Sequence, residues 1–223
     1  MKKFEKLGEA TTPEGTLLTL HRHDGDYLLR ADGGELMSTR RHHSEDRLAE
    51  MVCEPLRETP NARVLIGGLG LGFTLKAALR SLGDDARVEI AEIVGAVIEW
   101  NRNPEYGLGH DALLDPRVTL HHADVGQVLA ANPEAYDAVM LDVDNGAEAI
   151  VSTGNDRLYG AWGIRAAKAS LRPGGKLAYW CAGAEPAFVR ALRGAGLTVD
   201  ASEEPAYGAG GPMHALYLAY RPG

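Results

Sequence analysis

The chain has 223 residues, 45% of them hydrophobic and 24% charged, which is the composition of one ordinary globular domain. Its formal net charge of -8 disfavours binding to the phosphate backbone of nucleic acids and suits an amine or polyamine partner. No apolar run is long enough to span a membrane, no signal peptide is recognisable, and the two cysteines have no metal-type spacing, so we expect a cytoplasmic protein.

The first residues, 1–40, are expected to form a small β segment. Runs of β-type residues are separated by turn residues at 23–25 and 32–34. A helix is expected to follow at about 45–57, capped by the side chain of Ser44. The short strands of the β segment are expected at 17–21, 26–30 and 35–38.

Beyond Pro60 the pattern changes to strands that alternate with single helices. Two further segments near the C-terminus, 197–200 and 214–220, have no helix between them and are expected to pair as an antiparallel hairpin. The other strands are expected at 63–66, 87–92, 118–121, 136–142 and 176–180, and the helices at 73–82, 95–102, 158–171 and 185–194.

This order of elements predicts the fold class. Single helices between strands imply right-handed crossovers and a parallel sheet that is covered on both faces. The layout resembles the class I methyltransferase fold, an α/β, Rossmann-like, doubly wound sheet that is mostly parallel and ends in an antiparallel hairpin. We therefore expect two parts, the N-terminal β segment 1–40 and a Rossmann-like nucleoside-binding domain at 41–223.

A glycine-rich turn follows the first strand of the larger part. Gly68, Gly70 and Gly72 form a G-x-G-x-G pattern, in which glycine permits a tight turn and close approach of the backbone to a ligand. The dinucleotide pattern G-x-G-x-x-G is missed by one position. The turn instead resembles the nucleoside-binding turn of methyltransferases, with a close-packed turn that binds nothing as the alternative.

Three acidic residues are expected at the carboxyl ends of neighbouring strands, where ligands bind in doubly wound sheets. Glu92 is placed to accept hydrogen bonds from both ribose hydroxyls. Asp124 is placed to accept from an adenine amino group or, equally well, to cap the next helix. Asp142 is placed to face a reacting group. Alternatively, its carboxylate accepts hydrogen bonds from nearby backbone N–H groups and has no role in a reaction.

The chain resembles the spermidine synthase family over most of its length. The segments that carry the resemblance are the H-S-E stretch at 43–45, the glycine turn at 68–76, A-E-I-V at 91–94, D-V at 124–125, D-V-D-N-G at 142–146 and L-R-P-G-G at 171–175. The resemblance implies a homodimer and an S-adenosylmethionine-type donor whose nucleoside is held by Glu92 and Asp124. It also implies that Asp142 serves the nucleophilic amine, and we expect Asp142 and Asp144 to be the catalytic carboxylates. Asn145 lies where the family binds its polyamine, and Asp144 either contacts the acceptor beside it or caps the turn.

Two more residues are candidates for the acceptor site. The resemblance places the segment of His43 beside the acceptor. Tyr159 either lines that site or packs in the core. The histidine pairs of the chain have no metal-ligand spacing, and we expect no metal.

The sequence departs from the family at one decisive position. The family has an acid where this chain has Leu71, and that acid is expected to hold the aminopropyl ammonium of decarboxylated S-adenosylmethionine. An apolar residue leaves that cation unpaired. We therefore favour methyl transfer from S-adenosylmethionine to a small amine over aminopropyl transfer from the decarboxylated donor. A non-catalytic nucleoside-binding protein is the third alternative.

Overall fold

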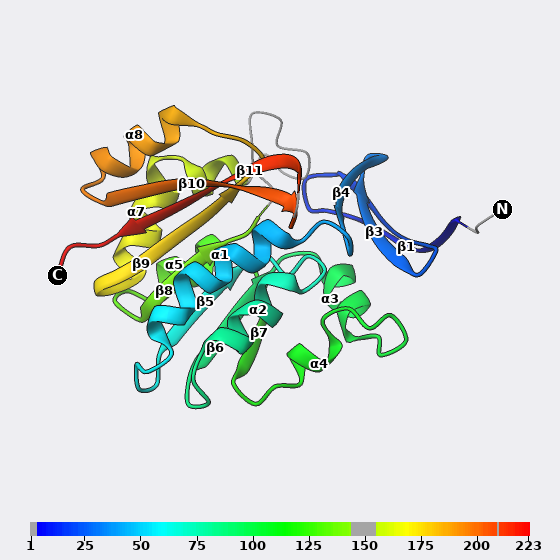
Figure 1. The fold of residues 1–223 in the computed structure, drawn as a ribbon, viewed down its shortest axis with the longest axis horizontal. Helices are drawn as coiled ribbons and strands as arrows, with labels where there is room; N and C mark the ends of the chain where they lie inside the picture. The colour runs from blue at the N-terminus through cyan, green and yellow to red at the C-terminus, as the bar shows by residue number, and fades with distance from the viewer. Residues whose placement is uncertain (1–3, 144–154, 209) are drawn as a thin grey trace.

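The computed structural model describes residues 4–143, 155–208 and 210–223, and it contains two β-sheets (Figure 1). The smaller sheet is antiparallel and consists of β1 (Phe4–Thr11), β2 (Leu17–His23), β3 (Asp26–Ala31) and β4 (Gly34–Ser38). It projects from one end of the molecule, beside the carboxyl ends of the strands of the larger sheet.

The larger sheet has the strand order β10-β11-β9-β8-β5-β6-β7. Its parallel part consists of β5 (Arg63–Gly67), β6 (Arg87–Glu92), β7 (Val118–His122), β8 (Tyr136–Leu141) and β9 (Leu171–Cys181). The antiparallel hairpin of β10 (Thr198–Tyr207) and β11 (Gly210–Tyr220) pairs with β9. The predicted Rossmann-like sheet with its C-terminal hairpin is thereby confirmed.

Helices cover both faces of this sheet. One face packs against α1 (His43–Cys53), α2 (Phe73–Ser81), α3 (Gly95–Arg102) and α4 (His110–Leu113), and the short 3-10 helix η1 (Glu54–Leu56) follows α1. The other face packs against α5 (Val125–Ala131), α6 (Asn155–Tyr159), α7 (Ala161–Ser170) and α8 (Pro186–Gly194). Successive residues of a strand contribute to opposite cores, as Ile66 and Leu65 of β5 do.

A third apolar cluster joins the smaller sheet to the glycine turn. It contains Leu20, Tyr27 and Leu29 from the small sheet, together with Leu71 of the turn and Leu108. Because all five side chains are buried, the small sheet is packed against the larger one at the end where ligands bind in this fold. The turn between β1 and β2 reaches the same region, because Thr12 and Glu14 line one cavity together with Gly68 and Gly70.

Several elements differ from the sequence-based expectation. Helix α7 ends at Ser170, and Leu171 already pairs with Tyr136 at the start of β9. The strands of the C-terminal hairpin are longer than predicted, because the ladder continues through the proline-containing segment to Tyr207 and Gly210. Pro205 is tolerated there because β10 is an edge strand. Strand β1 and helices α4 and α5 were not predicted.

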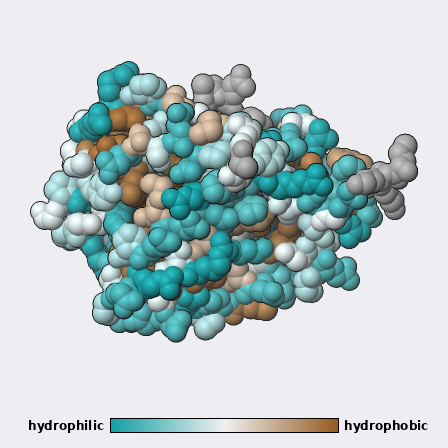
Figure 2. Space-filling model, in the orientation of Figure 1, coloured by the Kyte–Doolittle hydropathy of each residue, from teal (hydrophilic) through white to brown (hydrophobic). Residues whose placement is uncertain are grey.

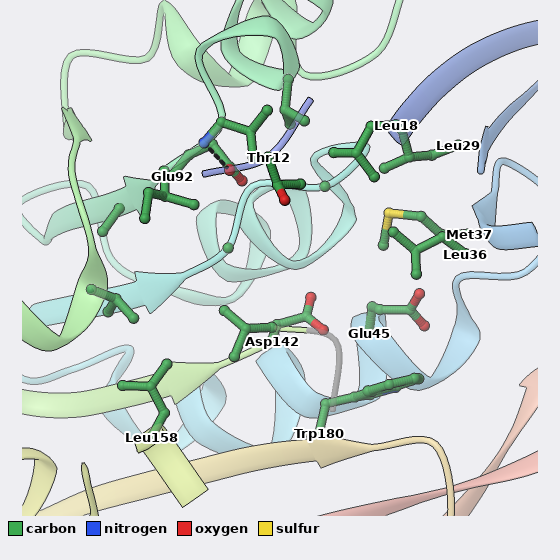
Figure 3. Close-up of a pocket in the computed structure, with 18 of the residues that line it drawn as sticks. Thr12, Leu18, Leu29, Leu36, Met37, Glu45, Glu92, Asp142, Leu158 and Trp180 are labelled. Atoms are coloured by element: carbon green, nitrogen blue, oxygen red, sulfur yellow. Dashed lines mark hydrogen bonds between the residues drawn. The ribbon is translucent and has the colours of Figure 1, made fainter. Parts of the chain in front are cut away.

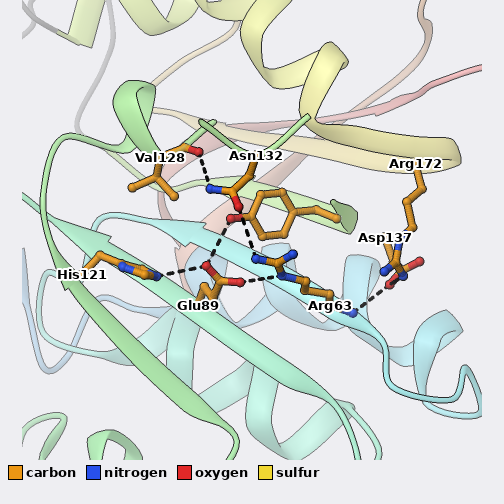
Figure 4. A network of polar contacts seen from close by, with 8 residues as sticks. Arg63, Glu89, His121, Val128, Asn132, Asp137 and Arg172 are labelled. Atoms are coloured by element: carbon orange, nitrogen blue, oxygen red, sulfur yellow. Dashed lines mark hydrogen bonds and ion pairs between the residues drawn. The ribbon is translucent and has the colours of Figure 1, made fainter. Parts of the chain in front are cut away.

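A network of polar side chains lies on the side of the larger sheet that faces away from α1 and α2 (Figure 4). The guanidinium of Arg63 donates to Glu89 at 2.6 Å and stacks over the ring of Tyr136 at 4.9 Å. His121 lies 3.0 Å from the same carboxylate, and Asn132 contacts Arg63. His121 is thus tied to a carboxylate that already binds an arginine, and this network joins four strands to the end of α5.

The face of the molecule drawn in Figure 2 is covered mainly by hydrophilic side chains, with the apolar ones in small groups. None of the helices in the described residues has the length and apolar character needed to cross a bilayer.

Candidate functional site

A cavity of about 260 Å³ lies where the carboxyl ends of the parallel strands meet the smaller sheet (Figure 3). Its floor consists of the glycine turn and the ends of β6 and β8, and its walls come from β4, α1, β9 and β11. The apolar wall residues include Leu18, Leu29, Leu36, Met37 and Trp180. The acidic ones are Glu14, Glu35, Glu45, Glu92, Asp124 and Asp142.

Two of the three glycines in the turn line this cavity, and both have left-handed backbone conformations. Gly68 has φ 91°, and a Cβ there would lie 2.3 Å from the carbonyl oxygen of Asp142. Gly70 has φ 51°, and a Cβ there would lie 2.7 Å from the sulfur of Met37. Gly72 instead packs against Gly109 and does not line the cavity. A residue with a side chain would therefore clash at Gly68 and at Gly70, so both positions require glycine.

Glu92 builds the glycine turn as well as facing the cavity. One of its carboxylate oxygens accepts from the backbone N–H of Leu69 at 3.0 Å, and the other accepts from Val94 at 2.8 Å. Burial raises the pKa of this carboxyl, and the backbone donors partly oppose that change. The backbone N–H groups of Gly70 and Ile93 also lower this pKa, so main-chain donors surround the carboxylate that lines the cavity.

Asp124 caps helix α5, because its side chain accepts from the backbone N–H of Gln127 at 2.9 Å. It lines the cavity at the same time, as do Val125 and Ile93, a residue that is 40% exposed. The capping alternative is thus confirmed, and one oxygen of Asp124 remains for a ligand. Ile93 offers an apolar surface next to it.

Asp142 and Glu45 form a carboxyl pair on the cavity wall (Figure 3). Asp142 accepts a hydrogen bond from the hydroxyl of Thr74, a side chain rather than a backbone donor. Glu45 is only 4% exposed. Burial together with the nearby charge of Asp142 raises the pKa of Glu45 to about 8, and burial raises that of Asp142 to about 6.

Ser44 organises the wall beside this pair. It was predicted to cap helix α1, but the structure begins that helix at His43 and gives Ser44 no capping hydrogen bond. Its hydroxyl instead contacts Glu45 and lies 2.8 Å from Nδ1 of His214, and it accepts from Nε1 of Trp180 at 3.0 Å. Trp180 itself lines the cavity.

Four predicted residues lie apart from this cavity or cannot be placed. His43 begins α1 and lies 3.8 Å from Glu204 on β10, and it does not line the cavity. Tyr159 is buried, and its hydroxyl donates to the carbonyl of Trp180 at 2.8 Å. Asp144 and Asn145 fall outside the described residues. For all four, a role in binding the acceptor stays a prediction.

Solved structures of spermidine synthases share this architecture. The enzyme from Thermotoga maritima superposes with a TM-score of 0.75 over 97% of this chain and 73% of its own, at 16% sequence identity. A spermidine synthase in complex with the transition-state analogue AdoDATO gives the same TM-score at 16% identity over 97% of this chain and 72% of its own. A probable spermidine synthase from Corynebacterium glutamicum gives 0.65 at 12% identity, over 96% of this chain and 79% of its own.

The chain has the spermidine synthase fold.

Sequence relatives agree with this fold at lower coverage. A protein-L-isoaspartate O-methyltransferase from Methanothermobacter thermautotrophicus is 25% identical over 152 residues, 63% of this chain and 65% of its own. Polyamine aminopropyltransferase 2 of Bacillus anthracis is 32% identical over 93 residues, 41% of this chain and 26% of its own. The chain thus matches less than two thirds of either relative, and no protein-family model matches it. Both relatives are group-transfer enzymes.

Within the spermidine synthase fold, the carboxyl pair makes stability depend on pH. The pKa of Glu45 rises from an ordinary 4.5 to about 8 in the folded chain, and that of Asp142 rises from 3.8 to about 6. Between these limits the unfolded chain binds fewer protons than the folded one, so stability falls as pH rises. We expect the melting temperature to fall between about pH 5 and pH 8.

The variant Glu45→Gln removes the larger contribution and should flatten this decline, which thermal unfolding at several pH values would measure. Glu50→Gln, on the same helix and paired with Arg47 at 2.7 Å, is the matched control and should keep the wild-type slope. An unchanged slope in Glu45→Gln would show that Glu45 titrates normally.

Proposed function

We propose that this protein transfers a methyl group from S-adenosylmethionine to a small amine. The observation that carries this proposal is the cavity, which joins a glycine turn and Glu92 to the carboxyl pair of Asp142 and Glu45. The glycine turn and Glu92 suit a nucleoside. The carboxyl pair of Asp142 and Glu45 suits a cation that must lose a proton. Because both groups of residues line one cavity, the site fits a reaction between a nucleoside-bearing donor and an amine.

The residues present fit such a donor. Gly68 and Gly70 line the cavity with backbone that carries no side chain, which a donor can approach closely. Glu92 lines the cavity and is proposed to accept from the ribose hydroxyls, and Asp124 is proposed to accept from the adenine amino group with the oxygen that does not cap α5. Ile93 supplies an apolar face for the base. The bound donor supplies an electrophilic methyl carbon on its sulfonium.

The carboxylates determine what the acceptor must be. An amine enters as an ammonium ion, which the acidic walls of the cavity attract. Asp142 then removes a proton from it, so that nitrogen can form its bond to the methyl carbon while the carbon–sulfur bond breaks and its electron pair stays on sulfur. Holding nitrogen and carbon in line is the main task of the site. Asp144 and Asn145 are proposed to contact the rest of the acceptor.

Leu71 and Arg41 favour methyl transfer over aminopropyl transfer. Leu71 is 2% exposed and packs with Leu20 and Tyr27 in the cluster under the small sheet, so no acid at this position faces an aminopropyl ammonium. Arg41 lines the cavity and is the one lysine or arginine among its described lining residues. A guanidinium suits the carboxylate that S-adenosylmethionine carries and the decarboxylated donor lacks.

We expect S-adenosylmethionine to bind at least as tightly as its decarboxylated form. Calorimetry with both donors, S-adenosylhomocysteine and methylthioadenosine measures this directly. Arg41→Met should weaken S-adenosylmethionine on the order of 10-fold and leave methylthioadenosine, which has no carboxylate, unchanged. Much tighter binding of the decarboxylated donor would contradict methyl transfer. Leu71→Asp is a poor test, because it would bury a charge in an apolar cluster and destabilise the fold.

Aminopropyl transfer to a polyamine is the second candidate. It is supported by the 32% identity with the aminopropyltransferase over 93 residues and by the acidic walls of the cavity, which suit a diamine. Product analysis after incubation with each donor and 1,4-diaminobutane separates the two reactions by mass. Binding of donors without any transfer would instead favour a nucleoside-binding protein.

A further inference from the structure

The geometry around Ser44 points to a proton that moves when the acceptor binds. We propose that Glu45 and Asp142 hold one proton between them in the unliganded protein, carried by Glu45, and that the chain Glu45–Ser44–His214 releases it when the acceptor's ammonium group enters. This inference rests on the proposed amine acceptor. It assigns to Glu45 and His214 a role that the sequence motifs did not suggest.

The hydrogen bonds of Ser44 carry the first step. A hydroxyl has one proton to donate and two acceptor sites. Trp180 Nε1 can only donate, so it takes one acceptor site at 3.0 Å. The remaining proton and acceptor site must be divided between Glu45 and His214 Nδ1.

Two arrangements satisfy all these groups. When Glu45 is protonated, it donates to Ser44, and Ser44 donates to Nδ1 of His214, whose proton is then on Nε2. When Glu45 is ionised, Ser44 donates to Glu45 and accepts from Nδ1–H of His214. Between the first arrangement and the second, both hydrogen bonds of the chain reverse their direction. One proton is also lost, and it leaves from Nε2 of His214. The chain therefore accommodates both charge states of Glu45 without losing a hydrogen bond.

The surroundings explain why the proton rests on Glu45. The titratable or charged groups around it are Asp142 after β8, Asp46 on α1 and His214 on β11. Arg41 lines the same cavity near His214 and is paired with Glu35 of β4 at 3.1 Å. Burial and, secondly, the charge of Asp142 raise the pKa of Glu45. Burial and the charge of Arg41 lower that of His214 to about 4, so the imidazole is neutral and can pass a proton on.

An ammonium ion between the two carboxylates reverses this balance. Its charge stabilises both in the ionised form, as an opposite charge within a few ångströms does. Glu45 then loses its proton to solvent through Ser44 and His214. The positive charge of the ammonium ion replaces the charge of that proton between the two carboxylates. Asp142 stays ionised and free to accept the proton that the nitrogen must lose before it attacks. The pair thus selects a cation over a neutral acceptor of equal size.

The test is a carboxyl ¹³C NMR titration of the full chain, which needs neither donor nor turnover. In the wild-type protein, the carboxyl signals of Glu45 and Asp142 should titrate above about pH 5. Each is assigned by its loss in Glu45→Gln or Asp142→Asn, which also separates them from the signal of Glu92, whose pKa is raised by burial. Asp142→Asn should lower the midpoint of Glu45 on the order of one pH unit, because it removes a like charge. The control variant Glu50→Gln should leave both signals unchanged.

The same titration is repeated with 1,4-diaminobutane and with 1,4-butanediol. The diamine should lower the midpoint of Glu45 on the order of one pH unit or more, and the neutral diol should not. Ser44→Ala should raise that midpoint in the unliganded protein, because the serine hydrogen bond lowers the pKa of Glu45. A midpoint near the ordinary glutamate value, or one that the diamine does not move, would overturn the proposal.

The outcomes separate this inference from the proposed function. Failure of every donor to bind in calorimetry would remove the methyl-transfer proposal and leave the titration result standing. Normal titration of Glu45 in a protein that binds donor and transfers methyl groups would remove only the proton chain.

Discussion

Asp142→Asn is expected to lower turnover about 10²-fold or more while the affinity for the donor stays nearly unchanged. Asparagine keeps the shape of the side chain and can still accept from the hydroxyl of Thr74. It cannot take a proton from the attacking nitrogen, so the loss falls on the chemical step. Single-turnover kinetics with a saturating acceptor measure that step, and calorimetry measures donor affinity.

A matched variant separates the role of Asp142 from a general effect of losing a carboxylate. Asp84→Asn changes an exposed residue in the turn before β6, at the end of the sheet away from the cavity, and should keep wild-type turnover. If Asp142→Asn retains full turnover, the proton acceptor is another group. Glu45 would then be the first to examine, because it shares the same wall.

Glu92→Ala is expected to abolish measurable donor binding and also to lower the stability of the fold. The change removes the acceptor for two backbone N–H groups, those of Leu69 and Val94. An unsatisfied buried N–H costs about 1–3 kcal/mol, so the glycine turn should loosen as the ribose contacts disappear. Calorimetry with S-adenosylhomocysteine and thermal unfolding of the same samples give both quantities.

Glu89→Ala provides the matched control on the same strand. Glu89 has a mostly buried side chain and binds Arg63 and His121 on the side of the sheet away from α1 and α2 (Figure 4). Its loss should lower the melting temperature as well, but it should leave donor binding intact. Donor binding by folded Glu92→Ala at wild-type affinity would show that the nucleoside is not held at the end of β6.

The framework of the site could be predicted from the sequence because its signals are local. A glycine turn after an apolar strand and a carboxylate at the end of each following strand need only the strand period and the rule that ligands bind at carboxyl ends. Gly68, Glu92 and Asp142 accordingly lie around one cavity. The dual role of Glu92 was not visible, because its backbone partners depend on how the turn folds back.

The rest of the wall could not be predicted because it depends on long-range packing. His214 is separated from Ser44 and Glu45 by most of the chain, and only the approach of β11 to α1 brings it to the Ser44 hydroxyl. Serine is a residue type that often caps helices, but the hydroxyl of Ser44 accepts a hydrogen bond from Trp180 instead of capping α1. Likewise, the sequence shows that Leu71 is apolar but not that it points into the cluster beneath the small sheet.

The close contact at Gly68 has a mechanical consequence. A Cβ at this position would overlap the carbonyl oxygen of Asp142, so the backbone of the donor turn rests directly on the backbone that carries the proton acceptor. In the proposed reaction, the distance between the methyl carbon and that carboxylate would thereby be set by two main-chain segments in close contact. Thermal motion should displace them together, which keeps the alignment of the reacting atoms while the walls around them move.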